Sequence, residues 1–265
     1  VESIPLIVGS IMSKKLAEGL DALVLDVKTG SGAFMETLWD AEDLAKALVK
    51  TGNDFNVKTE ALITDMSQPL GKFVGNALEV YECLKILRGE IDEAMQPTLD
   101  LSIELTARML VLTGIAKNID DASSICLEKL WDGEALEKFK QNIELQKGNP
   151  RVCDKPETLL EKKIKQIPIS AIKGGYVSGV DARAIGVAVC EIGGGRFKVS
   201  DKIDYSVGFS CETKIGEKVK KGDTLGVLYC RSQNQADSIS AKLQNAYKIG
   251  KEKPQNTELI KEIIG

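Results

Sequence analysis

The chain has 265 residues, of which 43% are hydrophobic and 28% are charged, and its formal net charge is −4. This composition is typical of a globular protein, and it indicates neither a nucleic-acid binder nor a membrane protein, because basic blocks and membrane-length apolar runs are absent from the sequence. The six cysteines form no CxxC pair and histidine is absent, which argues against a zinc site and is typical of a reducing cytoplasm.

The first third of the chain predicts alternating helices and buried strands. A helix is expected over 10–19, and the apolar run 21–27 predicts a buried strand. Apolar residues at helical spacing predict a helix over 40–51, and a second apolar run predicts a strand over 60–64. A strand, a helix and a second strand in this order form a βαβ unit, so we expect parallel strands covered by helices.

Further helices follow before a break in the pattern. They are expected over 75–88, 101–115, 122–130 and 134–146. The segment 148–150, Gly-Asn-Pro, then interrupts the helical pattern and marks a domain boundary.

After about residue 165, short alternating runs with turn signals predict a small β-rich lobe with one packed helix. Strands are expected over 167–172, 203–207, 216–219 and 224–229, with a helix over 181–191 and a mostly helical tail over 238–265. The predicted fold class is therefore α/β: a partial parallel sheet flanked by helices, followed by a smaller α+β C-terminal lobe.

Two segments of the first half could bind ligands. The loop 26–34 is glycine-rich and follows a strand, so its N–H groups could hold an anion, although a tight turn without a ligand is the simpler explanation. Ser10 and Lys14 lie four residues apart, which puts a hydroxyl and an ammonium on one helix face. Together they could clamp a polar ring, and a solvated helix face is the alternative.

Two further features carry charge near irregular backbone. Glu79 and Glu82 follow the loop 70–73, and a carboxylate beside backbone carbonyls can hold a hard cation, whereas a solvent-facing acid is the simpler reading. Lys214 lies in a turn-rich region similar to a lipoyl- or biotin-carrier hairpin, but its neighbours are not the usual Met-Lys-Met. We therefore expect Lys214 to be an unmodified surface lysine.

Motifs in order along most of the chain resemble pyrimidine-nucleoside and thymidine phosphorylases. They are Ser3–Ile7, Ser10–Lys15, Asp21–Lys28, Gly30–Met35, Thr64–Met66, Gln68–Gly71, Val74–Val80, Ala184–Gly186, Gly193–Arg196, Asp201–Asp204, Val207–Gly208 and Val219–Asp223. The resemblance implies a pentosyltransferase that performs reversible phosphorolysis: thymidine or uridine and phosphate give the free base and a pentose 1-phosphate. Both thymidine-only and broader specificity are compatible with these motifs.

The resemblance also implies roles for named residues. Ser10 would meet the ring N3–H of the base and Lys14 would face a ring carbonyl, so both bind substrate and Lys14 is catalytic. In relatives with bound potassium, the positions of Leu70, Phe73 and Glu82 contribute ligands, and Phe73 is usually a smaller residue. The family needs no organic cofactor, uses phosphate as co-substrate and implies a cytoplasmic homodimer whose partners are small molecules.

By the same resemblance, the family's phosphate-binding residues lie upstream of Val1. The expected domains are therefore 1–17, a remnant of a helical domain; 18–150, an α/β domain lacking its N-terminal strands; and 160–265, the C-terminal β-rich domain. We expect this chain alone to be inactive. One alternative is a phosphoribosyltransferase of the same fold class, although such enzymes usually lack the β-rich unit. Another is a non-catalytic binding or carrier module, which covalent modification of Lys214 would support.

Overall fold

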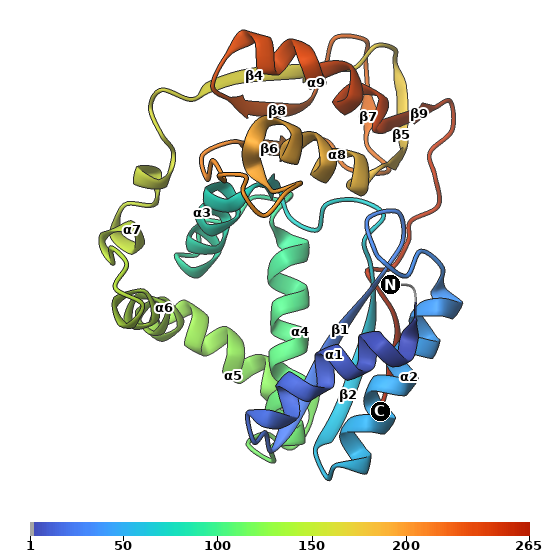
Figure 1. Cartoon of the computed structure of the whole chain (residues 1–265), viewed down its shortest axis with the longest axis vertical. Helices are drawn as coiled ribbons and strands as arrows, with labels where there is room; N and C mark the ends of the chain where they lie inside the picture. The colour runs from blue at the N-terminus through green and yellow to red at the C-terminus, as the bar shows by residue number, and fades with distance from the viewer. Residues whose placement is uncertain (1–2) are drawn as a thin grey trace. The chain divides into compact units, whose positions relative to one another are not determined.

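The computed structural model describes residues 3–265, and their contacts group them into two compact units (Figure 1). The first unit comprises the described residues up to Met66, together with Asp100–Glu128 and Thr257–Gly265. The second unit comprises Ser67–Leu99 and Lys129–Asn256. Val1 and Glu2, where the predicted helical remnant begins, lie outside the described residues, and the predicted domain boundaries stay a prediction.

The first unit is built on a three-stranded sheet in the order β1-β2-β10. Strands β1 (Ala22–Thr29) and β2 (Lys58–Asp65) pair in parallel, which confirms the parallel strands expected from the sequence. Strand β10 (Ile260–Ile264) pairs antiparallel with the other edge of β2. The last residues of the chain thus return to the sheet that its first strands form (Figure 1).

Helices α1 (Ile4–Ala17) and α2 (Leu38–Asp54) pack together in the first unit and share its core. Helix α2 begins where the side chain of Thr37 accepts a hydrogen bond from the backbone N–H of Asp40, because this bond satisfies one of the unpaired donors of the first turn. Met12 of α1 and Leu48 of α2 are each almost fully buried, so one face of each helix is fixed by the core.

The helices between the two strand-rich parts of the chain agree with the sequence expectations. They are α3 (Asn76–Leu87), α4 (Gln96–Leu112), α5 (Ile119–Trp131) and α6 (Glu134–Leu145). The short α7 (Arg151–Asp154) and the 3₁₀ turn η1 (Pro156–Leu159), which follow them, were not expected from the sequence. In the described residues no helix is long and apolar enough to cross a bilayer.

The second unit contains two antiparallel sheets, in the orders β3-β6-β8-β4 and β7-β5-β9. The strands are β3 (Phe73–Val74), β4 (Lys165–Ser170), β5 (Gly175–Val180), β6 (Gly208–Cys211), β7 (Lys218–Val219), β8 (Thr224–Cys230) and β9 (Tyr247–Gly250). The helical elements are α8 (Ala182–Val189), the π-helical turn η2 (Cys190–Gly194) and α9 (Gln233–Asn245). Phe209, Ile185, Leu228 and Ile239 lie at the centre of its core.

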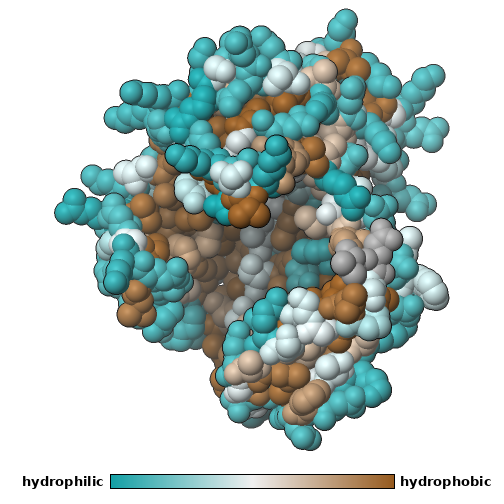
Figure 2. Space-filling model, viewed as in Figure 1, coloured by the Kyte–Doolittle hydropathy of each residue, from teal (hydrophilic) through white to brown (hydrophobic). Residues whose placement is uncertain are grey.

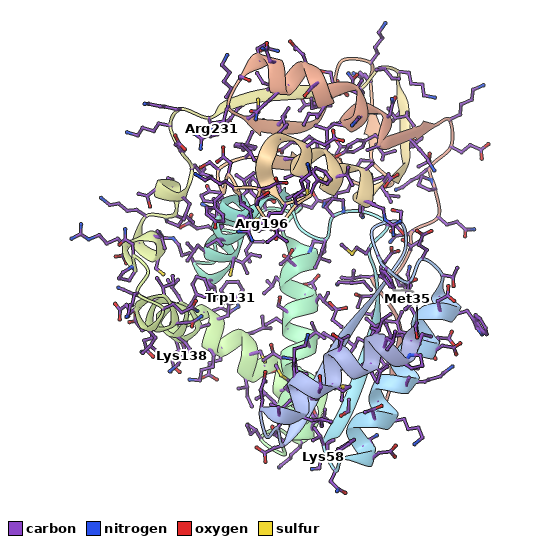
Figure 3. The ribbon with its side chains drawn as sticks, viewed as in Figure 1. Met35, Lys58, Trp131, Lys138, Arg196 and Arg231 are labelled. Carbon is purple, nitrogen blue, oxygen red and sulfur yellow. The ribbon has the colours of Figure 1, made fainter. Side chains whose placement is uncertain are left out.

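Two sequence expectations for this part were wrong. The expected strand over 203–207 is irregular. Asp204 accepts two hydrogen bonds from the guanidinium of Arg231 (2.6 and 2.8 Å), and its backbone N–H donates to the carbonyl of Gly193. Arg231 is labelled in Figure 3. The tail is helical only to Asn245; its later apolar residues form β9 and β10, since they complete the edges of two sheets. The overall α/β class with a smaller C-terminal lobe is confirmed.

Candidate functional site

Ser10 and Lys14 lie on the exposed side of α1. Because they are four residues apart in an uninterrupted helix, they share one face, while Val8 and Met12 are buried on another. The surface over α1 mixes apolar and polar side chains (Figure 2). Leu6 of this helix is 62% exposed. Lys14 makes no ion pair with any residue that the structure describes, so its ammonium is available to a ligand.

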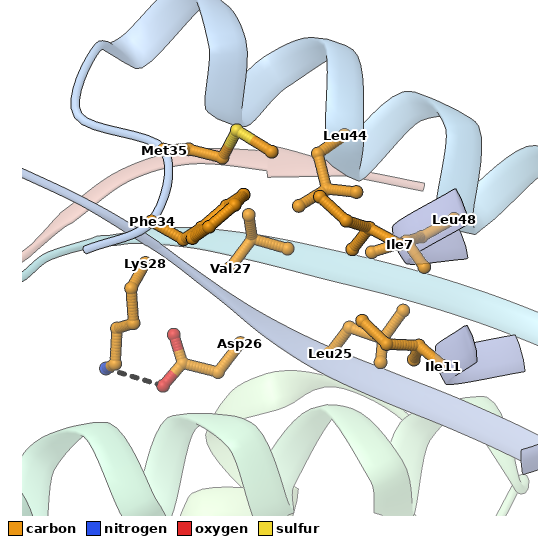
Figure 4. Close-up of a pocket in the computed structure, with 10 residues that line it drawn as sticks. All are labelled: Ile7, Ile11, Leu25, Asp26, Val27, Lys28, Phe34, Met35, Leu44 and Leu48. Atoms are coloured by element: carbon orange, nitrogen blue, oxygen red, sulfur yellow. Dashed lines mark ion pairs between the residues drawn. The ribbon is translucent and has the colours of Figure 1, made fainter. Parts of the chain in front are cut away.

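A pocket of about 440 Å³ lies in the first unit beside this helix (Figure 4). Its walls are apolar side chains from α1, β1, the loop after β1 and α2, with one charged pair. The lining residues are Ile7, Ile11, Leu25, Asp26, Val27, Lys28, Phe34, Met35, Leu44 and Leu48. Neither Ser10 nor Lys14 lines it, so the pocket and the predicted base clamp are separate features of α1 and its neighbours.

The charged pair of the pocket belongs to a closed polar cluster between the two parallel strands. Lys28 Nζ lies 2.6 Å from Asp26 Oδ2 and donates a hydrogen bond to Thr64 Oγ1 (2.9 Å). The hydroxyl of Thr64, which is fully buried, donates to Asp26 Oδ1 at 2.5 Å. The cluster stands toward the carboxyl ends of β1 and β2, the edge of a parallel sheet where ligands commonly bind.

The glycine-rich loop after β1 closes on the backbone. The N–H groups of Gly32 and Ala33 donate to the carbonyls of Met66 and Gly30, both at 3.0 Å, and Gly30 has a φ of 107°, which favours glycine. Met66 N–H in turn donates to Thr29 carbonyl at 2.6 Å. Two of the N–H groups that could have faced an anion are therefore engaged, and the geometry is that of a tight βα turn.

Glu82 lies in the second unit and is 4% exposed. Its carboxylate accepts hydrogen bonds from the backbone N–H groups of Lys72 (3.2 Å) and Phe73 (2.8 Å) and from the hydroxyl of Thr98 (3.1 Å). Burial raises the pKa of Glu82, and these hydrogen bonds and the nearby Lys214 ammonium oppose that rise. Glu82 does not face solvent, which was the simpler reading of the sequence, because its three donors hold it inside.

The three positions of the predicted potassium site, Leu70, Phe73 and Glu82, have partners within the chain. Glu82 is already surrounded by N–H and O–H donors, and the carbonyl of Leu70 lies 3.5 Å from Lys214 Nζ. Phe73 packs its ring edge-to-face against Tyr81, with centroids 5.7 Å apart. The potassium site at these three positions stays a prediction, and an ammonium of the chain already lies among the described residues of this region.

Lys214 differs from the surface lysine expected from the sequence. Its ammonium is partly buried and donates to backbone carbonyls of the turn 69–71. The expectation was wrong because local sequence shows the turn around Lys214 but not the second turn, 145 residues away, that faces it. A carrier hairpin needs a projecting lysine, so this geometry also argues against the carrier alternative.

Sequence reasoning overlooked the Asp26–Thr64 and Glu82–Thr98 contacts. Their only sequence signal is indirect: Lys28 and Thr64 become neighbours once the two strands are paired in register, as the predicted βαβ unit allows. Thr98 lies 16 residues from Glu82 and carries no signal of its own.

Comparison with known proteins gives two matches to family models. Residues 1–136 match the glycosyl transferase family a/b domain, and residues 176–250 match the pyrimidine nucleoside phosphorylase C-terminal domain. The two matches fall on both parts of the chain that the resemblance covers.

Individual relatives carry the same name. The chain is 45% identical over 252 residues to a pyrimidine-nucleoside phosphorylase of Bacillus subtilis (strain 168), covering 95% of this chain and 57% of the relative. It is 43% identical over 264 residues to a pyrimidine-nucleoside phosphorylase of Staphylococcus aureus (strain MSSA476), covering 100% of this chain and 60% of the relative. The chain thus spans a little more than half the length of these relatives.

Proposed function

Because the chain belongs to the pyrimidine-nucleoside phosphorylase family, we propose that it supplies the base-recognition part of an enzyme that cleaves pyrimidine nucleosides with phosphate. The single observation that carries the proposal is the pairing of Ser10 and Lys14 on one exposed face of α1. The relatives are named pyrimidine-nucleoside phosphorylase, which supports a pentosyl transfer from a pyrimidine nucleoside. Thymidine or uridine is the nucleoside proposed here.

The proposed chemistry is electrostatic. A phosphate oxygen attacks the anomeric carbon, the bond from that carbon to the base nitrogen breaks, and the electron pair of this bond passes to the base ring. Lys14 would stabilise the negative charge that develops on a ring carbonyl, and Ser10 would fix the ring through its N3–H group. An ammonium without an internal partner is suited to this role, because the described chain offers no carboxylate that neutralises Lys14 first.

Phosphate is the proposed co-substrate, and no organic cofactor is proposed. The loop 26–34 is a poorer phosphate site than its glycines suggest, because the N–H groups of Gly32 and Ala33 are engaged. We further propose a homodimer in the cytoplasm as the working form, on the strength of family membership. The molecular mass from sedimentation of the assembled enzyme tests whether it is a homodimer.

The two alternative functions are less well supported. A phosphoribosyltransferase of the same fold class does not explain the match of residues 176–250 to the pyrimidine nucleoside phosphorylase C-terminal domain. A carrier module would need Lys214 exposed, and its ammonium is bonded to three backbone carbonyls.

A chimera tests the proposed function. In the Staphylococcus aureus relative, the segment that matches this chain is replaced by the 265-residue chain. This relative is chosen because the match covers 100% of the 265-residue chain. We expect the chimera to release uracil or thymine from the nucleoside only when phosphate is present. A chimera that folds, as shown by a cooperative thermal transition, and releases no base would contradict the proposal; the unmodified relative is the positive control.

A further inference from the structure

The turn between β6 and β7 carries a lysine whose side chain points into the protein. Lys214 Nζ lies 2.7 Å from the carbonyl oxygen of Pro69 and 3.5 Å from that of Leu70, and it also donates to the carbonyl of Gly71. An ammonium has three donors, so three successive carbonyls of one turn can use its whole hydrogen-bonding capacity. All four residues belong to the second unit.

The two segments are joined at other points as well. Gln68 Oε1 accepts a hydrogen bond from the backbone N–H of Ile215 (2.9 Å), and Lys72 carbonyl accepts from Cys211 N–H (2.7 Å). Strand β3 pairs with β6, with Phe73 opposite Ser210. The turn 69–71 and the turn between β6 and β7 are therefore joined by several hydrogen bonds, and those of Lys214 are the ones that involve a charged group.

The charge of Lys214 has a buried counterpart. Glu82 is 4% exposed, lies close enough to Lys214 for each to affect the ionisation of the other, and holds the N–H groups just after the turn. Burial lowers the pKa of Lys214, while Cys211, Glu82, Glu217 and Asp92 favour its charged form. A carboxylate removed from water needs a positive partner, and removal of that partner leaves a costly uncompensated charge.

We propose that Lys214 is a positioning residue whose ammonium holds the turn 69–71 and balances Glu82, so that this part of the fold needs no potassium ion. The carbonyls of residues 69–71 and the carboxylate of Glu82 form the kind of oxygen-rich environment that a monovalent cation would occupy. The positive charge in this environment is the ammonium group of Lys214, which is part of the chain itself. This inference goes beyond the proposed phosphorolysis and does not depend on it.

The experiment uses the full 265-residue chain and measures its melting temperature, Tm. We expect Lys214→Met to lower Tm by roughly 6 °C or more, since it leaves three carbonyls of the turn 69–71 without their donor and removes a positive charge that favours the ionised form of Glu82. Lys221→Met, which changes an exposed lysine nearby, is the matched control and should leave Tm nearly unchanged. Equal Tm values for the two variants would overturn the proposal.

Two further measurements distinguish an effect of the positive charge of Lys214 from an effect of the packing of its side chain. We expect the unmodified chain to have the same Tm in potassium, sodium and choline chloride at equal ionic strength. A potassium-specific rise with Lys214 intact would overturn the proposal, and this test stands even if Lys214→Met fails to fold. Methylammonium should raise the Tm of Lys214→Ala but not that of Lys221→Ala; no selective rise would count against the ammonium as the active group. None of these readouts involves phosphorolysis, so they succeed or fail independently of it.

Discussion

The hydroxyl of Thr64 lies 2.5 Å from Oδ1 of Asp26 and joins the two parallel strands of the first unit near their carboxyl ends. Thr64 is fully buried, and the same hydroxyl accepts from Lys28. Each member of the cluster therefore has a partner within it, and Asp26 and Lys28 are the charged side chains among the described residues that line the pocket beside α1.

Thr64→Val tests this cluster, because the substitution keeps the shape of the side chain and removes the hydroxyl. We expect the free energy of unfolding to fall by about 1–3 kcal/mol, since Asp26 and Lys28 both lose a buried partner. Urea denaturation followed by circular dichroism measures it. Thr113→Val, at the exposed residue that follows the last residue of α4, is the control and should change stability by less than about 0.5 kcal/mol. Equal effects at the two positions would mean that the cluster does not stabilise the sheet.

Gly71→Ala tests the surroundings of Glu82. A β-carbon at Gly71 would lie 1.9 Å from Oε1 of Glu82 and 2.5 Å from Oγ1 of Thr98, so the carboxylate would have to move away from its donors. We expect a loss of about 1–3 kcal/mol in thermal or urea unfolding. Gly186→Ala in α8 is the control, because a β-carbon there meets nothing within 4 Å and should be neutral or slightly stabilising. A stable Gly71→Ala variant would show that Glu82 is held loosely.

Deletion of Thr257–Gly265 tests the role of β10. The deletion removes the antiparallel partner of β2, the ion pair of Lys261 with Asp65 (2.9 Å) and one edge of the sheet. We expect amide hydrogen exchange to become faster in β2 and to stay unchanged in β8 of the second unit. Unchanged exchange in β2 would show that the sheet does not depend on its third strand.

Periodicity predicted the elements well where local pattern decides them. The strands expected at 21–27 and 60–64 and the helices of the middle of the chain follow from apolar spacing, and the structure contains them. The strand at the end of the tail could not be predicted, because Ile260 and Ile263 are apolar at a spacing that also fits a helix, and only the open edge of β2 makes them part of a strand.

The candidate site residues could likewise be predicted where their relationship is local in the sequence, and could not where it is long-range. Ser10 and Lys14 could be placed on one helix face from sequence alone, since their relationship is local. Lys214 could not, because its partners lie about 145 residues away and only the folded chain brings the two turns together. A solvent-facing acid was the simpler reading of Glu82, and its hydrogen-bond donors in Lys72, Phe73 and Thr98 cannot be recognised in a local pattern either.

Ser10→Ala, made in the Staphylococcus aureus chimera, tests the neutral half of the proposed base clamp. We expect kcat/KM for phosphorolysis to fall by about 2- to 10-fold, the effect of losing one neutral hydrogen bond. Ser13→Ala, on the same helix one turn away, should leave kcat/KM unchanged. A larger loss at Ser13 than at Ser10 would mean that the wrong hydroxyl has been assigned.

Lys14→Ala in the same chimera tests the central claim most directly. We expect kcat/KM to fall by roughly 10²-fold or more with Tm unchanged, because Lys14 is exposed and has no internal ion pair, so its charge serves the transition state. Lys15→Ala, which removes the neighbouring lysine paired with Glu18 at 3.7 Å, is the control and should retain activity. Phosphate-dependent turnover by Lys14→Ala equal to that of Lys15→Ala would contradict the assignment of base recognition to α1.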